Sequence, residues 1–416
     1  METKALVQWI FLGRDCWREI FSNVSFRERN RLRIVCKNFN QWIIEQKDFW
    51  PLGKSKETDK LSFFSEYEQY FSIVKNVWNQ TYKQYKAQIE NEFKDIFARF
   101  NFGIVLVWYK KSSKKGFSIY SKDLKHLFSF DKQVDRIQAS KDYIVYRENK
   151  EETFLLKFKY SSKDSLEIES KTLIDIGTND YYYSLFEYPY FSIRQDGKYK
   201  PILINLLNRK NLLNKAVIPE GFSSDILYNE YFSITNHTIR ETWIYEINQI
   251  DKPPYKIKTM KAEDLFIDEK MFFLAYSIGD YNESMIDAYN LKTKKYTKTE
   301  FQTIWPMFIN KDFVITEIDN GVYHILRWNQ DFTQLTLWKE LNSNCIQIDC
   351  FHPSLPFFAI KIDAGEFVYS KKGKELIHSH VLDKEHYLML AGDQYSRLYF
   401  LTKENGNYFI NGIDFK

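Results

Sequence analysis

The chain has 416 residues and a formal net charge of +4, and 44% of its residues are hydrophobic. This length and composition suit two or three domains with buried cores. The small excess of positive charge is spread along the chain, without a dense basic stripe that carries interleaved aromatic residues. The composition therefore argues against a nucleic-acid-binding protein.

The lack of recognisable targeting signals and the small number of cysteines indicate the compartment of the protein. No apolar run approaches the roughly 18 residues that a membrane-spanning helix needs, and no N-terminal signal peptide is visible. The four cysteines are too few and too scattered for a disulfide framework. We therefore expect a protein of the cytoplasm or the nucleus with reduced thiols and without contact to a membrane.

Residues 12–50 have the spacing of short amphipathic helices. Asp15 fits an N-cap, and the apolar residues that follow recur at helical intervals, namely Trp17, Ile20, Phe21 and Val24. Ser25 and Glu28 have the spacing of a capping box, after which the same interval recurs in Leu32, Val35, Cys36 and Phe39. A module of about forty residues is too small to bury a self-sufficient core. We therefore expect another surface to complete it.

This segment resembles the F-box, whose pattern runs from a leucine-proline pair through R-L-R-x-V-C to a closing tryptophan. The matching residues are Leu12, Glu19, Ile20, Phe21, Ser22, Arg31, Leu32, Arg33, Val35, Cys36, Lys37, Phe39 and Trp50. Gly13 departs from the pattern, because the family usually has proline there and glycine leaves the first turn less rigid.

The resemblance implies docking to a Skp-type adaptor of a cullin-RING ubiquitin ligase. The residues that it places at or just behind the adaptor interface are Leu12, Trp17, Ile20, Phe21, Val35, Cys36, Phe39 and Trp50. Whether Gly13 weakens adaptor binding is left open. The alternative is an ordinary helical hairpin that packs on its own domain.

Residues 51–98 are predicted to link this F-box-like module, residues 1–50, to the rest of the chain. The first ten, PLGKSKETDK, are polar and typical of a connector. Apolar residues then recur at intervals of three and four, which predicts one linker helix or a pair of helices. They are Tyr70, Val74, Val77, Trp78, Tyr82, Tyr85, Ile89, Phe93 and Ile96.

Residues 99–416 are predicted to form an all-β domain, because short β-branched and aromatic runs alternate there with polar turns. Related strings recur at intervals of roughly 40 to 47 residues, the length of one four-stranded propeller blade. They are DYIVYR at 142, YFSIR at 190, YFSIT at 231, MFFLAY at 271, DFVIT at 312 and PFFAIK at 356. We predict a β-propeller of seven or eight blades and favour eight. The marks of WD and kelch repeats are missing, so a large β-sandwich is the alternative.

Motifs of catalysis are missing from the chain. It has no Gly-x-Ser-x-Gly, Walker loop, dinucleotide fingerprint or His-Glu-x-x-His. His378 and His380 would share one face of a strand, but a third metal ligand at suitable spacing is lacking. Cys345 and Cys350 would point to opposite faces. We therefore predict no metal site, no cofactor and no catalytic residue.

Alignment of the recurrent strings places several basic residues at one equivalent position. If Tyr143, Tyr190, Tyr231 and Phe357 are equivalent positions, Arg147, Arg194, Thr235 and Lys361 are equivalent too, near the ends of the second strands. In a propeller those ends meet at the rim of one face. Arg147, Arg194 and Lys361 are therefore candidate ligands for an acidic or phosphorylated peptide. The alternative is that these strand ends are simply solvated.

The predicted layout is a multidomain α plus all-β protein, with an F-box-like module, a helical linker and a propeller-like domain. It suits a non-catalytic substrate receptor of an SCF-type ubiquitin ligase, which binds an adaptor and cullin complex at one end and a target protein at the other. The alternatives are an interaction scaffold outside the ubiquitin system and a propeller-fold hydrolase.

Overall fold

A computed structural model describes the part of the chain from residue 72 onward, with gaps. The described residues are 72–110, 114–148, 152–174, 183–194, 201–215, 218–228, 231–236, 238–239, 241–258, 262–268, 271–277, 284–291, 293–298, 302–303, 305–319, 321–329, 331–343, 346–349, 357–362, 365–370, 375–379, 390–392 and 397–416. The chain divides into two compact units, one of residues 1–79 with residue 416 and one of residues 80–415. Within the first unit, residues 72–78 form a helix in which Ile73 and Val77 are buried.

The second unit is all-β, and its described strands form eight sheets, which we number in chain order. Sheet 1 contains β2 (Glu92–Phe100), β3 (Gly103–Lys110), β4 (Lys114–Tyr120) and β5 (His126–Phe130). Sheet 2 contains β6 (Val134–Ser140), β7 (Tyr143–Glu148), β8 (Glu152–Ser162) and β9 (Ser165–Ile174). Sheet 3 contains β10 (Tyr183–Glu187), β11 (Tyr190–Arg194), β12 (Ile202–Asn205) and β13 (Lys210–Asn211), followed by the 3-10 helix Leu212–Lys215.

Sheets 4 to 8 repeat this antiparallel, chain-ordered pattern. Sheet 4 contains β14 (Ser223–Tyr228), β15 (Tyr231–Asn236), β16 (Glu241–Glu246) and β17 (Tyr255–Lys258), with the 3-10 helix Ile247–Gln249 before β17. Sheet 5 contains β18 (Ala262–Asp268), β19 (Met271–Ser277), β20 (Ser284–Asn290), β21 (Lys295–Thr297) and β22 (Gln302–Thr303). Sheet 6 contains β23 (Trp305–Ile309), β24 (Phe313–Asp319), β25 (Val322–Trp328) and β26 (Leu335–Asn342). Sheet 7 contains β27 (Ile346–Asp349), β28 (Phe357–Ile362), β29 (Gly365–Ser370) and β30 (Glu375–Ser379). Sheet 8 contains β31 (Leu390–Gly392), β32 (Arg397–Glu404), β33 (Asn407–Asp414) and, beside β33, β1 (Lys83–Ile89).

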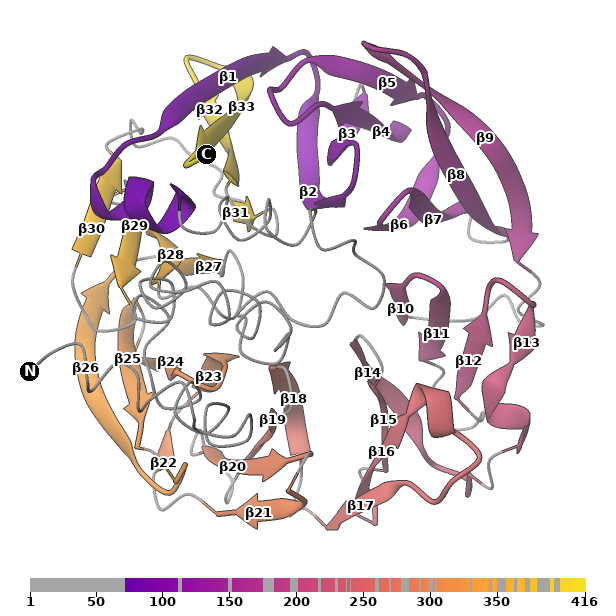
Figure 1. Ribbon diagram of the computed structural model, residues 1–416, viewed down its shortest axis with the longest axis vertical. Coiled ribbons are helices and arrows are strands. Elements are labelled where there is room, and N and C mark those ends of the chain that lie inside the picture. Colours follow the sequence, from indigo (N-terminus) through magenta and orange to yellow (C-terminus); the bar gives the residue numbers. More distant parts are fainter. Residues whose placement is uncertain are drawn as a thin grey trace, which may run out of the picture. The chain divides into compact units, whose positions relative to one another are not determined.

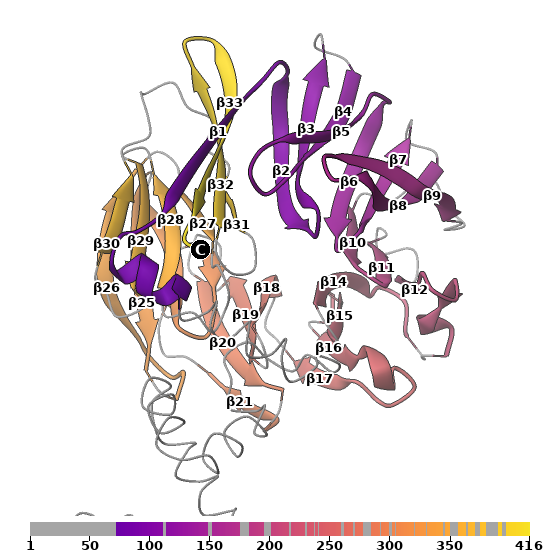
Figure 2. The same ribbon diagram turned by 45° about the horizontal axis from the view of Figure 1, so that its top comes forward.

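Neighbouring sheets follow one another around a ring (Figure 1), which Figure 2 shows tilted. From sheet 1 to sheet 6, the first strand of each sheet contacts the first strand of the next sheet. Strand β31 of sheet 8 contacts both β27 of sheet 7 and β2 of sheet 1. Sheets 6 and 7 share an apolar cluster that includes Ile315 and Phe358. The described sheets therefore form a closed ring that resembles a β-propeller, as the repeat spacing predicted, and not a two-layer sandwich.

The second strand of each sheet is buried on both faces. In β7, Ile144 packs in the cluster shared with sheet 1, whereas its neighbour Val145 packs in the cluster shared with sheet 3. Phe272 and Phe273 of β19 divide in the same way between the seams with sheets 4 and 6. A strand buried on both faces needs apolar residues in succession. This burial explains the recurrent strings, each of which forms a second strand as its spacing indicated.

The predicted linker helix is wrong over residues 83–98, where the structure has β1 and most of β2. In β1, exposed residues alternate with less exposed ones: Tyr85 and Ala87 are half-buried and Ile89 is buried. In β2 a bulge between Phe93 and Asp95 shifts the register, so Phe93 and Ile96 lie on one face although they are three residues apart. Bulged strands and helices can thus share the same spacing. The all-β unit starts at residue 80, ahead of the expected boundary at 99.

Ring closure depends on two chain segments that are far apart in sequence. Strand β1 pairs with β33 along its whole length, from Lys83 opposite Asp414 to Ile89 opposite Tyr408. The start of the unit therefore supplies the outer strand of sheet 8, whose other three strands come from its end. A sheet completed in this way prevents the first and last sheets from separating.

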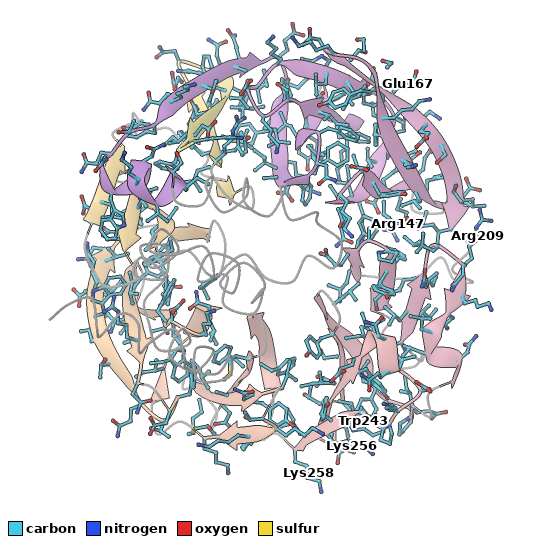
Figure 3. The ribbon with its side chains drawn as sticks, in the orientation of Figure 1. Arg147, Glu167, Arg209, Trp243, Lys256 and Lys258 are labelled. Carbon is cyan, nitrogen blue, oxygen red and sulfur yellow. The ribbon has the colours of Figure 1, made fainter. Side chains whose placement is uncertain are left out.

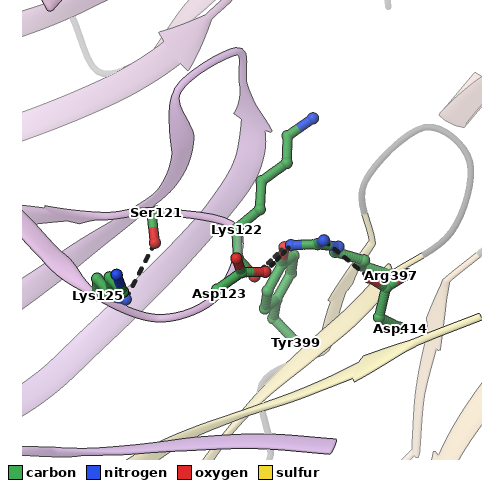
Figure 4. A network of polar contacts seen from close by, with 7 residues as sticks. All are labelled: Ser121, Lys122, Asp123, Lys125, Arg397, Tyr399 and Asp414. Atoms are coloured by element: carbon green, nitrogen blue, oxygen red, sulfur yellow. Dashed lines mark hydrogen bonds and ion pairs between the residues drawn. The ribbon is translucent and has the colours of Figure 1, made fainter. Parts of the chain in front are cut away.

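A polar network joins sheets 8 and 1 at this closure (Figure 4). The Arg397 guanidinium lies 2.7 Å from a carboxylate oxygen of Asp414 and 3.1 Å from one of Asp123, which belongs to the turn between β4 and β5. From the same strand as Arg397, the Tyr399 hydroxyl donates to the Lys122 carbonyl oxygen at 3.2 Å. The Asp414 side chain is only 4% exposed, and Arg397 supplies a cation that compensates its buried charge.

The paired β1 predicts how the chain tolerates truncation. Removal of residues 1–79 should leave the cooperative unfolding of the β domain intact, because β1 remains. Removal of residues 1–91 should lower the free energy of unfolding by about 3 kcal/mol or more, because the β1 ladder and the burial of Ile89 are lost. Urea unfolding monitored by tryptophan fluorescence compares the two truncated chains. Equal stabilities would contradict a closing role for β1.

Arg397→Ala should lower the free energy of unfolding by about 3 kcal/mol, because it leaves the buried Asp414 carboxylate without its cation. Lys122→Ala is the matched control, since Lys122 enters the network only through its backbone carbonyl. The control should change stability by less than about 0.5 kcal/mol. Urea unfolding of both variants against the parent chain measures the difference.

Candidate functional site

The residues expected to contact the adaptor all lie outside the described residues. They are Leu12, Trp17, Ile20, Phe21, Val35, Cys36, Phe39 and Trp50. Their roles at an interface stay predictions.

The three candidate cations lie on second strands, as the alignment of the repeats required. Arg147 lies on β7, Arg194 on β11 and Lys361 on β28. In the strand ladders, Arg147 lies opposite Arg136 on one side and Thr153 on the other. Lys361 likewise lies between Gln347 and Glu366. The backbone thus supports the equivalence of these positions.

Arg147, labelled in Figure 3, forms an ion pair within its own sheet. Its guanidinium binds the Asp135 carboxylate through Nε, at 3.1 Å, and through Nη2. The Arg147 side chain is only 9% exposed. Its charge is therefore matched within the sheet by Asp135, and its role toward an acidic peptide stays a prediction. The side chains of Arg194 and Lys361 lie outside the described residues, so their roles stay predictions.

The fourth aligned position carries no charge and forms a buried hydroxyl pair. Thr235 on β15 is 1% exposed, and its Oγ1 lies 2.9 Å from Oγ1 of Thr242 on β16. The equivalent positions in sheets 2 and 4 are thus both satisfied within their own sheets.

An aromatic pair where sheets 2 and 3 meet was not expected from the sequence. The rings of Tyr143 and Tyr188 stack with centroids 3.8 Å apart and planes 9° apart. Lys141 lies with its ammonium 5.7 Å from the Tyr188 ring centroid. Burial and the hydrogen bond with Tyr143 raise the pKa of Tyr188 to about 12. Tyr188 precedes a proline in a turn, so periodicity could not have paired it with Tyr143.

No group of three or more potential metal ligands occurs in the part of the chain that the structure describes. His378 lies on β30, whereas His380, Cys345 and Cys350 fall outside that part. Among the same residues, no helix has the length and apolar character needed to cross a membrane.

Comparison with protein families identifies the N-terminal segment. Residues 9–50 match the family model of the F-box domain. The matched range encloses the residues whose helical spacing and R-L-R-x-V-C sequence resembled that module. No match to the chain was found among curated proteins.

Solved structures with a related architecture cover most of the chain at low identity. BamB from Moraxella catarrhalis is 9% identical with a TM-score of 0.46, over 80% of this chain and 98% of that one. The C-terminal WD40 domain of Sif2 is 12% identical with a TM-score of 0.46, over 79% and 98%. The computationally designed Ika8 protein is 8% identical with a TM-score of 0.48, over 78% and 96%.

The Arg147–Asp135 pair predicts a pH dependence of stability. Burial alone would raise the pKa of Asp135, but the hydrogen bond and charge of Arg147 outweigh it and lower the pKa below its ordinary value. A lowered folded-state pKa stabilises the protein above the unfolded value of about 3.9, and this contribution is lost as pH falls through the folded-state pKa.

Asp135→Asn should therefore cost about 1–2 kcal/mol at neutral pH, and the difference from the parent chain should shrink below about pH 4. Asp164→Asn, at an exposed carboxylate 3.9 Å from Lys125, is the control and should change little. Denaturant unfolding across the pH range measures both. A difference that does not vary with pH would contradict the ion pair.

Proposed function

We propose that this chain, which carries an F-box domain at residues 9–50 ahead of an all-β domain that resembles a β-propeller, is the substrate-recognition subunit of an SCF-type ubiquitin ligase. The observation that carries the proposal is the F-box match over residues 9–50. The F-box binds the Skp-type adaptor, and the β domain selects a target protein. Like F-box proteins in general, the chain does no covalent chemistry itself.

The F-box would act through a small number of apolar anchors. The sequence spacing predicts that Ile20 and Phe21 follow Trp17 by one helical turn and that Val35 and Phe39 share one face of the next helix. A few buried aromatic and aliphatic side chains dominate the binding energy of most interfaces, and each costs about 2 kcal/mol or more when it is truncated. We assign the adaptor contact to these residues together with Leu12, Cys36 and Trp50.

The β domain would supply a rigid recognition surface. We propose that its eight sheets are the eight blades of one propeller, closed by β1. The strands of such a ring are held by neighbours on both faces, so surface groups keep fixed positions. A target held on this surface is brought near the ubiquitin-loaded enzyme of the ligase, which makes transfer to a target lysine effectively intramolecular.

The double variant Ile20→Ala and Phe21→Ala should abolish co-purification of the adaptor with the full chain, because it removes two anchors of the interface. The control is Leu207→Ala with Ile239→Ala, which truncates two apolar residues that are 69% and 55% exposed on the β domain. The control should retain the adaptor, and the circular dichroism of both variants should match the parent chain. Retention of the adaptor by the first variant would refute the assignment and favour a scaffold outside the ubiquitin system.

A further inference from the structure

Strand β17 forms the outer edge of sheet 4. One of its sides pairs with β16, from Tyr255 opposite Ile244 to Lys258 opposite Glu241. On its other side, no strand of the described residues pairs with it. The backbone amide and carbonyl groups along such an edge can pair with a strand from another chain.

The two faces of β17 differ in chemistry. Tyr255 and the buried Ile257 join the apolar cluster between sheets 4 and 5. Lys256 and Lys258 alternate with them and are exposed, as Figure 3 shows at the rim of the ring. The Lys256 ammonium lies 4.0 Å from the centroid of the buried Trp243 ring, which orders its stem. The edge therefore presents two ammonium groups at strand spacing.

These two ammonium groups have no carboxylate within 4.0 Å in the part of the chain that the structure describes. Glu241 lies across from Lys258 in the ladder, but one of its carboxylate oxygens accepts a hydrogen bond from Nε1 of Trp243 at 3.0 Å. Further exposed lysines lie nearby in sequence and across the seam. The Lys294 ammonium, in the turn directly before β21 of sheet 5, lies 5.0 Å from the Tyr255 ring centroid. The nearby carboxylates Glu241 and Glu246 accept hydrogen bonds from Trp243 and from the Tyr255 hydroxyl, the latter at 3.0 Å, so the lysine ammonium groups stay accessible on this part of the rim.

Several lysines near the rims of other sheets have acidic partners. On sheet 2, Lys157 pairs with Glu169 at 2.6 Å and Lys159 with Glu167 at 3.1 Å, both across β8 and β9. On β1, Lys86 lies 2.5 Å from Glu404. The outer strand of sheet 3, β13, has only two residues. Lys339 on the outer strand β26 (Leu335–Asn342) donates to the Tyr369 hydroxyl at 2.8 Å. Strand β17 differs from these rims, because its two exposed lysines alternate along a strand edge without a carboxylate within 4.0 Å among the described residues.

We propose that the edge of β17 binds an extended acidic segment of a partner protein by strand addition. The segment alternates Asp or Glu with apolar residues. Its backbone extends the ladder of sheet 4, its carboxylates lie beside Lys256 and Lys258, and its apolar side chains continue the face of Tyr255 and Ile257. Opposite charges on neighbouring strands stabilise this register.

A second copy of the chain is a poor occupant of the same edge. Two β17 strands side by side would bring lysines against lysines, and like charges directly opposite destabilise a ladder. Lysines on an edge strand commonly prevent such self-association. An acidic segment satisfies the same charges. The inference goes beyond the proposed function, because binding at β17 does not depend on the adaptor.

The test measures binding of a fluorescent peptide of alternating Glu and Val residues to the full-length chain by anisotropy. The peptide should bind, and its affinity should fall as salt is added. Lys256→Glu with Lys258→Glu should weaken binding by about tenfold or more, because two attractive pairs become repulsive. Lys163→Glu with Lys210→Glu makes the same change of charge at exposed sites elsewhere and should leave the affinity within about twofold.

Two further probes separate strand addition from general attraction to negative charge. A peptide of the same composition with its Glu residues grouped, and one with alternate N-methylated amides, should both bind about tenfold more weakly or worse, because neither can extend the ladder in register. Equal binding of these peptides would overturn the proposal. The proposal would also be overturned if the Lys256→Glu and Lys258→Glu variant bound the alternating peptide as tightly as the parent chain. Loss of binding to anionic vesicles or duplex DNA in that variant, with peptide binding unchanged, would identify a different partner class. Thermal unfolding confirms that each variant is folded.

Discussion

The antiparallel pairing of β1 with β33 joins the beginning of the β domain to its end, and the ring depends on that pairing. With sheet 8 completed, sheets 1 and 8 share an apolar cluster that includes Ile104 and Leu401. Each sheet then has a neighbour on both faces. The consequence is a core divided into seams, each filled by the second strands on either side.

This architecture decides which groups are available for binding. Because the faces of the sheets are covered, recognition is left to the loops and to the outer edges. Arg147 lies on a second strand, where burial makes an internal partner necessary, and Asp135 supplies it. Lys256 and Lys258 lie on an outer strand, where solvent tolerates an unpaired charge. A basic side chain therefore stabilises the fold where it is buried and is available to attract a partner where it is exposed.

Second strands could be predicted from the sequence because two-sided burial produces apolar runs, such as MFFLAY at 271 and PFFAIK at 356. Strands β1 and β2 could not be predicted in the same way. The half-buried Tyr85 and Ala87 give β1 only a weak alternation. The bulge after Phe93 gives β2 a spacing of three that imitates a helix. Local spacing does not reveal which distant strand will pair with such a segment.

The sequence by itself determined the F-box at residues 9–50, because that module is recognised by local residues such as Leu32, Val35 and Cys36 at helical spacing. It also determined the repeat of the β domain, because every second strand meets the same two-sided burial. Tertiary structure alone decided that residues 83–89 close the ring and that Arg147 is bound by Asp135. It also decided that β17 presents an edge with unmatched lysines. Each of these depends on contacts between segments that the chain folds together, and no local pattern specifies such contacts.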